Sequence, residues 1–97
     1  MKTKQFPRFR LQDGSIVYAI AWAMDTFRSG WAWIATDIVK QDSGDILYYG
    51  YVKTHKEEFR TFSKKALEKI GITIYTNPET VDSLRPPEGW TRLPDVD

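Results

Sequence analysis

The chain has 97 residues, of which 41% are hydrophobic and 14% are aromatic, and its formal net charge at pH 7 is +1. A chain of this length forms one domain with a modest core, and its apolar fraction excludes an intrinsically disordered protein. The absence of cysteine excludes disulfides, cysteine-ligated zinc sites and thiol nucleophiles. The near-neutral charge produces no global field of either sign.

Alternating residue types predict strands through the first half of the chain. The first strand is expected around Phe9, and Asp13-Gly14 after it predicts a tight hairpin turn. Residues 15–24 alternate large and small apolar side chains. We therefore expect one strand there, apolar on both faces and central in its sheet. Ser29-Gly30 marks the turn that follows.

Two further strands are expected at residues 31–40 and 46–54, with a turn at residues 42–45 between them. Gly50 lies inside the second of these strands, where a glycine indicates a bulge or a close approach of backbone. A short fifth strand is predicted at residues 58–62.

Helix signals lie in the second half of the chain. Ser63 is a typical N-cap residue, and Phe62 and Leu67 around it have the spacing of a hydrophobic staple. Gly71 is a typical stop after the last turn. Asn77-Pro78 is a second helix-start signal.

These elements predict an α+β fold. We expect an antiparallel meander sheet of four or five strands, with one short helix at residues 63–70 packed on one face. Residues 1–87 form this single domain, and residues 88–97 are expected to be a turn-rich tail that frays at its end. Trp90 and Leu93 are the residues that could attach the tail to the domain.

The stretch from residue 30 to residue 79 resembles the bacterial domain of unknown function 2958, a family often carried on mobile genetic elements. The resemblance depends on the order of several sequence cues. They are Trp31, Trp33 and Thr36 in one strand, Asp45, Tyr49, Gly50 and Val52 in the next, then Phe62-Ser63, Leu67, Gly71-Ile72 and Glu79. It implies a small accessory protein and supplies no functional residue. The N-terminal residues 1–24 depart from the family, which tends to be helical there.

No catalytic constellation is predicted. His55 is the only histidine and lies in a polar connection, so a usual zinc site cannot form from it without carboxylates or a second chain. Asp42 and Asp45 flank a turn, where aspartate commonly accepts local backbone hydrogen bonds. The sequence has no nucleophile motif and no glycine-rich phosphate loop. We expect no catalytic residue, no cofactor and no metal.

The candidate binding surface consists of aromatic and basic residues. Its members are Trp31, Trp33, Tyr49, Tyr51, Lys53, Arg60, Lys64 and Lys65. Tryptophan and tyrosine are favoured anchors of protein interfaces. The run from Tyr49 to Val52 also matches the middle of the aromatic strand of RNA-recognition domains, although the flanking residues differ.

We therefore expect a non-enzymatic binding or accessory module with a protein partner. The alternative is a module that binds single-stranded nucleic acid through Tyr49, Tyr51 and nearby cations. An enzyme is the third and least favoured class. Homodimerisation through an edge strand stays open as well. The charged N-terminus and the shortness of the apolar run at residues 16–24 predict a cytoplasmic protein without a membrane span.

Overall fold

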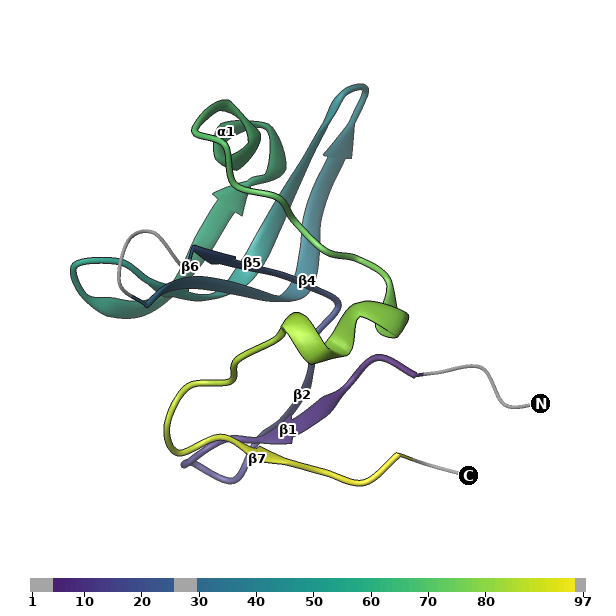
Figure 1. Ribbon diagram of the computed structural model, residues 1–97, viewed down its shortest axis with the longest axis vertical. Helices are drawn as coiled ribbons and strands as arrows, with labels where there is room; N and C mark the ends of the chain where they lie inside the picture. The colour runs from purple at the N-terminus through teal and green to yellow at the C-terminus, as the bar shows by residue number, and fades with distance from the viewer. Residues whose placement is uncertain (1–4, 26–29, 96–97) are drawn as a thin grey trace.

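The computed structural model describes residues 5–25 and 30–95 of the chain (Figure 1). A three-stranded antiparallel sheet has the order β2-β1-β7, formed by β1 (Arg8–Arg10), β2 (Ile16–Tyr18) and β7 (Thr91–Arg92). A four-stranded antiparallel sheet has the order β3-β4-β5-β6, formed by β3 (Ala21–Asp25), β4 (Trp31–Asp42), β5 (Asp45–Lys53) and β6 (Glu57–Ser63). The helices are α1 (Lys64–Lys69) and the 3₁₀ helix η1 (Pro78–Ser83).

The α+β class is confirmed, but the expected single sheet is corrected to two. The strand predicted at residues 15–24 divides at Ala19 and Ile20, because the hydrogen-bond partner of the chain changes there. The N–H of Ala19 donates to the carbonyl of Pro7, next to β1, whereas the N–H of Ile20 donates to Ala35 of β4. As a result β3 is an edge of the four-stranded sheet and not a central strand.

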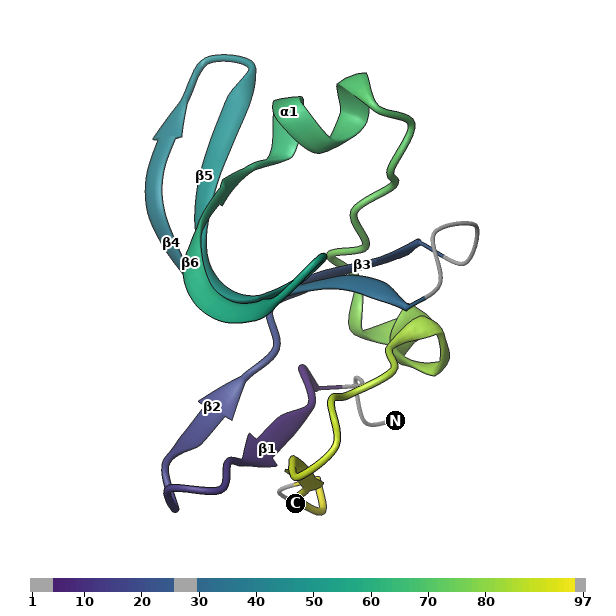
Figure 2. The ribbon, with the colours of Figure 1, turned by 90° about the vertical axis from the view of Figure 1, so that its left-hand side faces the viewer.

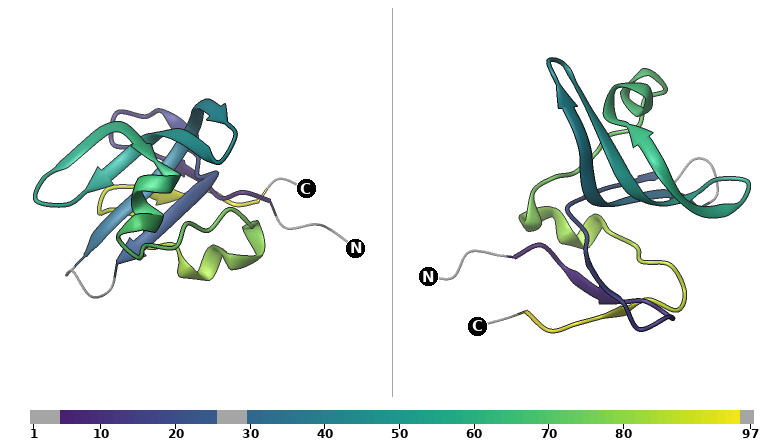
Figure 3. Two further views of the ribbon diagram at one scale, coloured as in Figure 1. Left: turned by 90° about the horizontal axis from the view of Figure 1, so that it is seen from above. Right: turned by 180° about the vertical axis from the view of Figure 1, so that it is seen from behind.

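Hydrophobic residues are buried on both faces of the four-stranded sheet. Figure 2 shows this sheet curled, with α1 on its concave side and the three-stranded sheet on the other side. The first cluster, on the α1 side, contains Ala21, Ala23, Trp33, Ala35, Tyr48, Val52, Phe62, Leu67 and Ile72. The second cluster, between the two sheets, contains Phe9, Ala19, Trp22, Ile34, Tyr51, Val81 and Leu84. The two further views in Figure 3 show η1 on the same side as the small sheet.

Both faces of β3 are buried, as its sequence predicts, although the strand is not central. Ala21 and Ala23 face the α1 side, and Trp22 is fully buried on the opposite side. The indole Nε1 of Trp22 donates to the hydroxyl of Ser83, 2.8 Å away, so this buried polar group has a partner. The outer edge of β3 is closed by Tyr75, which exchanges two backbone hydrogen bonds with Trp22.

Gly50 lies where β4 and β5 approach most closely. It pairs with Ala35, next to a register shift between Ala35 and Asp37. A Cβ at this position would overlap the carbonyl oxygen of Ile34 and lie 2.8 Å from the Cα of Ala35. Both features indicated by this glycine, a bulge and a close approach, are therefore present.

The start of α1 is held by two side chains. The hydroxyl of Ser63 accepts from the N–H of Ala66, which confirms the predicted N-cap, and donates to the carboxylate of Asp45. Asp45 also accepts from the N–H of Lys65 at 2.9 Å. The β4–β5 turn is thus hydrogen-bonded directly to the first turn of the helix.

The turn-rich segment at residues 88–97 contributes to the fold as far as residue 95. Its β7 pairs with β1, and Trp90 packs against the second cluster. The N–H of Leu93 donates to the carbonyl of Arg8, and the Arg8 guanidinium donates to the carbonyl of Pro94. The loop expected around Ser29-Gly30 falls largely on residues 26–29, which lie outside the described residues.

The first prediction concerns Gly50. Because an added methyl group meets backbone atoms that cannot rotate away, Gly50→Ala is expected to lower the free energy of unfolding by at least about 3 kcal/mol, measured by urea denaturation. Gly44→Ala is the matched control. Gly44 has φ +86° but no atom within 4 Å of the added carbon. This control is expected to cost only about 1 kcal/mol. Equal losses in both variants would contradict the role assigned to the close approach.

The second prediction concerns Asp45. The Lys65 N–H and the Ser63 hydroxyl hold the pKa of this carboxyl below its usual value of 3.8. Its ionised form therefore stabilises the folded state above about pH 4, and this contribution is lost as the pH falls through the lower folded-state pKa. Asp45→Asn should reduce the urea midpoint at neutral pH, and the difference from wild type should shrink on acidification.

Asp42→Asn is the control, because that exposed carboxylate pairs with Lys40 and not with α1. This variant should leave the change of the urea midpoint on acidification the same as in wild type. Residual acid sensitivity in the Asp45 variant is expected from Asp13, whose pKa is lowered by hydrogen bonds from Ser15. If the difference in urea midpoint between wild type and Asp45→Asn stayed constant down to strong acid, the stabilising role of the ionised Asp45 would be contradicted.

Candidate binding groove

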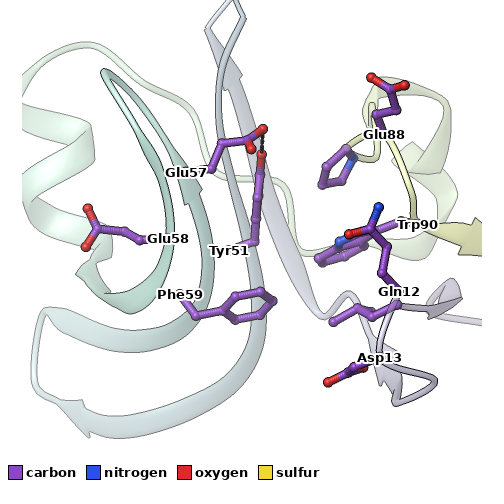
Figure 4. A pocket seen from close by; sticks show the side chains of 10 residues that line it. Gln12, Asp13, Tyr51, Glu57, Glu58, Phe59, Glu88 and Trp90 are labelled. Carbon is purple, nitrogen blue, oxygen red and sulfur yellow. Dashed lines mark hydrogen bonds between the residues drawn. The ribbon is translucent and has the colours of Figure 1, made fainter.

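Three aromatic rings from distant parts of the chain meet beside the second cluster (Figure 4). They belong to Tyr51 of β5, Phe59 of β6 and Trp90, which precedes β7. The Tyr51 ring centroid lies 6.1 Å from that of Phe59 and 5.6 Å from that of Trp90. The Phe59 and Trp90 rings lie 6.2 Å apart with an angle of 20° between their planes. Each of the three rings therefore contacts the other two.

These rings line a groove of about 340 Å³. We call it the aromatic groove, and its lining residues are Leu11, Gln12, Asp13, Tyr51, Glu57, Glu58, Phe59, Pro87, Glu88 and Trp90. Among the described residues its charged members are four carboxylates, and no lysine, arginine or histidine lines it. Figure 4 shows Phe59 and Trp90 pointing toward one another, while Glu58 is directed away from the space between them. Glu88 is exposed and makes no hydrogen bond or ion pair within the described part of the chain.

Tyr51 connects the rings to the acidic side of the groove. Its hydroxyl donates to a carboxylate oxygen of Glu57 at 2.8 Å, and the residue is only 6% exposed. Burial, followed by the hydrogen bond to Glu57, raises the pKa of Tyr51 well above its usual value of 10.0. The Nζ of Lys53 lies 4.0 Å from the same Glu57 oxygen, so this carboxylate is shared between a buried hydroxyl and a surface cation.

A second hollow of about 350 Å³ adjoins the aromatic groove. The two share Tyr51, Glu57, Pro87 and Glu88. The second hollow is lined in addition by both signs of charge, from Lys53, Arg85 and the buried Asp25, among other residues. The uniform acidity is therefore confined to the side that contains Phe59 and Trp90.

The structure distributes the eight residues of the expected binding surface over both faces of the sheet and α1. Tyr49, Tyr51 and Lys53 alternate along β5 on the side of the aromatic groove, with Tyr49 38% exposed. Trp33 is buried in the first cluster, and Trp31 lies edge-on to it.

The remaining three are basic. Arg60 lines a groove of about 450 Å³ on the helix side of the sheet together with Trp31 and Trp33. Lys64 pairs with Glu68 on α1. Lys65 is exposed on the same helix. The aromatic and basic residues singled out from the sequence thus do not share one surface.

Sequence reasoning missed Phe59, Glu57, Glu88 and Trp90 as site residues. The two rings are separated by a long stretch of chain. The carboxylates come from the β1–β2 connection, from the start of β6 and from the connection before β7. No local motif links them. The only local signal was the large ring of Phe59, which lies on a predicted strand beside two acidic residues, Glu57 and Glu58.

Within residues 5–25 and 30–95, no group of three or more histidine, aspartate or glutamate side chains could hold a metal ion. In the same residues, no helix has the length and apolar character needed to cross a membrane. Neither a protein-family model, nor a curated protein, nor a solved structure matches this chain. The resemblance to the domain of unknown function 2958 therefore stays a prediction.

The third prediction concerns Tyr51. Because its raised pKa favours the neutral hydroxyl in the folded protein, the stability that Tyr51 contributes is present below about pH 10 and is lost at higher pH. Tyr51→Phe should lower the free energy of unfolding at pH 7 by about 1 kcal/mol, the value of one buried hydrogen bond. It should also lose less stability than wild type between neutral and alkaline pH. Tyr18→Phe, at an exposed position, is the control and should change neither quantity. If Tyr51→Phe lost as much stability as wild type between neutral and alkaline pH, the role of the Tyr51 hydroxyl would be contradicted.

Proposed function

We propose that this protein is a small, non-enzymatic binding module that takes a basic segment of a protein partner into the aromatic groove. One observation carries the proposal. Tyr51, Phe59 and Trp90 meet in a groove whose charged lining residues, within residues 5–25 and 30–95, are all acidic.

The chemistry of the groove suits an arginine or lysine side chain. A cation over an aromatic face is attracted by the ring quadrupole, by about 0.5–1 kcal/mol at an exposed site. Phe59 is 41% exposed, so part of its ring is open to such a ligand. Glu88 has no partner of its own in the described residues and can pair with an arriving cation without losing an existing contact. The apolar stem of the same side chain would lie on Leu11 and Pro87.

Binding of single-stranded nucleic acid is the second candidate function. It is favoured by the exposed rings of Tyr49 and Phe59, which lie 6.1 Å apart on one face and could stack with bases. It is less well supported because the same face carries the carboxylates of the aromatic groove, which repel phosphate. Lys53, on the same strand as Tyr49, is already close to Glu57, and Arg60 lies on the opposite face.

The fourth prediction is a binding measurement. A fluorescein-labelled octapeptide of alternating arginine and serine is titrated with the protein and followed by anisotropy. We expect micromolar affinity that weakens as salt is raised, because ion pairing at a surface is screened. A glutamate–serine octapeptide and a thymidine oligonucleotide should not bind in the same range. Preferential binding of the oligonucleotide would favour the second candidate and contradict the first.

Matched variants locate the binding site. Glu88→Lys should weaken the arginine–serine peptide by about fivefold to tenfold, since an attraction becomes a repulsion. Glu79→Lys makes the same change in charge at an exposed position of η1 that does not line the groove, and should leave affinity within about twofold. Phe59→Leu keeps an apolar side chain but removes the ring face, and should weaken binding by about fivefold. Equal effects of the two glutamate changes would show that only overall charge matters and would overturn the proposal.

A further inference from the structure

One edge of the four-stranded sheet is covered, and the other is free. Tyr75 closes the β3 edge with two backbone hydrogen bonds to Trp22. At the opposite edge, β5 is the one strand of the described chain with which β6 pairs. Figure 2 views the molecule from this side and shows β6 in front of β5 and β4. In an antiparallel strand, alternate residues direct N–H and C=O away from their partner. Within the described chain, none of these outward groups of residues 57–62 meets another backbone group.

The free edge carries an exposed ring between opposite charges. Phe59 is 41% exposed although it contacts three other rings, and it is flanked in sequence by Glu58 and Arg60. Because side chains alternate along a strand, Glu58 and Arg60 lie on one face of the sheet and Phe59 lies on the other. Exposed edge strands of this kind pair readily with another strand, because their unpaired N–H and C=O groups are already aligned.

Among registers centred on residues 58–60, the charge pattern favours one for pairing β6 with itself. When two copies of one strand pair antiparallel, residues that face each other must direct their N–H and C=O groups in the same sense, either both toward the other strand or both away from it. Such residues are an even number of positions apart in the sequence, so the two-fold axis passes through a residue that faces its own copy. An axis at Glu58 sets glutamate against glutamate, and an axis at Arg60 sets arginine against arginine. An axis at Phe59 instead sets Glu58 of each copy against Arg60 of the other, and it brings the two Phe59 rings together. Opposite charges directly across a pair of strands stabilise it, and like charges destabilise it.

We propose that β6 pairs antiparallel with β6 of a second copy of this chain, with the two-fold axis at Phe59. The occupant of the edge is a second copy because the order Glu58, Phe59, Arg60 makes the edge complementary to itself in charge. A two-fold interface uses each contact twice, so two ion pairs and one ring pair form from three residues of each chain. The junction is short compared with a standard interface, and the dimer is expected to dissociate with a constant of about 10–500 μM.

The experiment is sedimentation velocity from low micromolar to millimolar protein, without peptide. The wild type should shift from monomer to dimer over this range. Glu58→Arg and Arg60→Glu each set like charges across the junction twice and should remain monomeric. An equimolar mixture of these two variants should form a heterodimer, because every facing pair is then of opposite charge. The double variant Glu58→Arg, Arg60→Glu should dimerise as the wild type does.

Lys65→Glu reverses a charge on α1, away from the edge, and should leave the dimer unchanged. Should either reversal prevent folding, Glu58→Gln and Arg60→Gln replace it, and each should weaken the dimer by about fivefold through loss of two weak ion pairs. A wild type that stays monomeric at millimolar concentration overturns the proposal. So does a mixture of the two reversal variants that fails to associate. These readouts do not involve Glu88, so a failure here is separate from a failure of the proposed groove.

Discussion

The shape of this protein depends on the close approach of β4 and β5 at Gly50. A side chain at that position would overlap the Ile34 carbonyl, and the register shift beside Ala35 lies directly opposite. Bulges increase local twist and bend the strand that carries them. The four-stranded sheet curls accordingly, with one face turned toward α1 and the other toward the small sheet. A flatter sheet of this size would present two broad faces, and a single short helix could cover only part of one.

The curl explains how so short a chain buries two sets of apolar residues. Along β5, Tyr48 and Val52 enter the first cluster, whereas Tyr51 enters the second. Residues of both parities are therefore buried, and each cluster contains large rings, which bury much area per residue. Asp45 and Ser63 hold α1 over one face through hydrogen bonds, and β7 with Trp90 covers the other. The same arrangement leaves Phe59 half-covered, because Trp90 reaches only one side of its ring.

Features determined by neighbouring residues could be predicted from the sequence. The Asp13-Gly14 turn joins β1 to β2, Ser63 caps α1, and Gly50 marks the close approach. Features determined by distant residues could not. The large–small alternation of residues 15–24 runs unbroken through Ala19 and Ile20, so nothing local marks the change of sheet. Nothing local shows either that Ile16 and Tyr18 of β2 are exposed, whereas β3 is buried on both faces. The groove was missed for the same reason: Phe59 meets Trp90 only because β7 pairs with β1, and a two-residue strand has almost no sequence signature.

Strand β6 connects the two proposed interactions. Phe59 points into the aromatic groove, whereas the side chain of Glu58 is directed away from it and Arg60 lies on the helix side, so ion pairing between copies need not displace the carboxylate of Glu88. With a two-fold axis at Phe59, the grooves of the two copies open on the same face of the joined sheets. A partner with two basic groups could then occupy both, and the second contact would form at high effective concentration. Each shallow groove offers a single cation only a few favourable contacts. Weak association of two copies at the β6 edge would in this way raise the affinity of the pair for a partner with two basic groups.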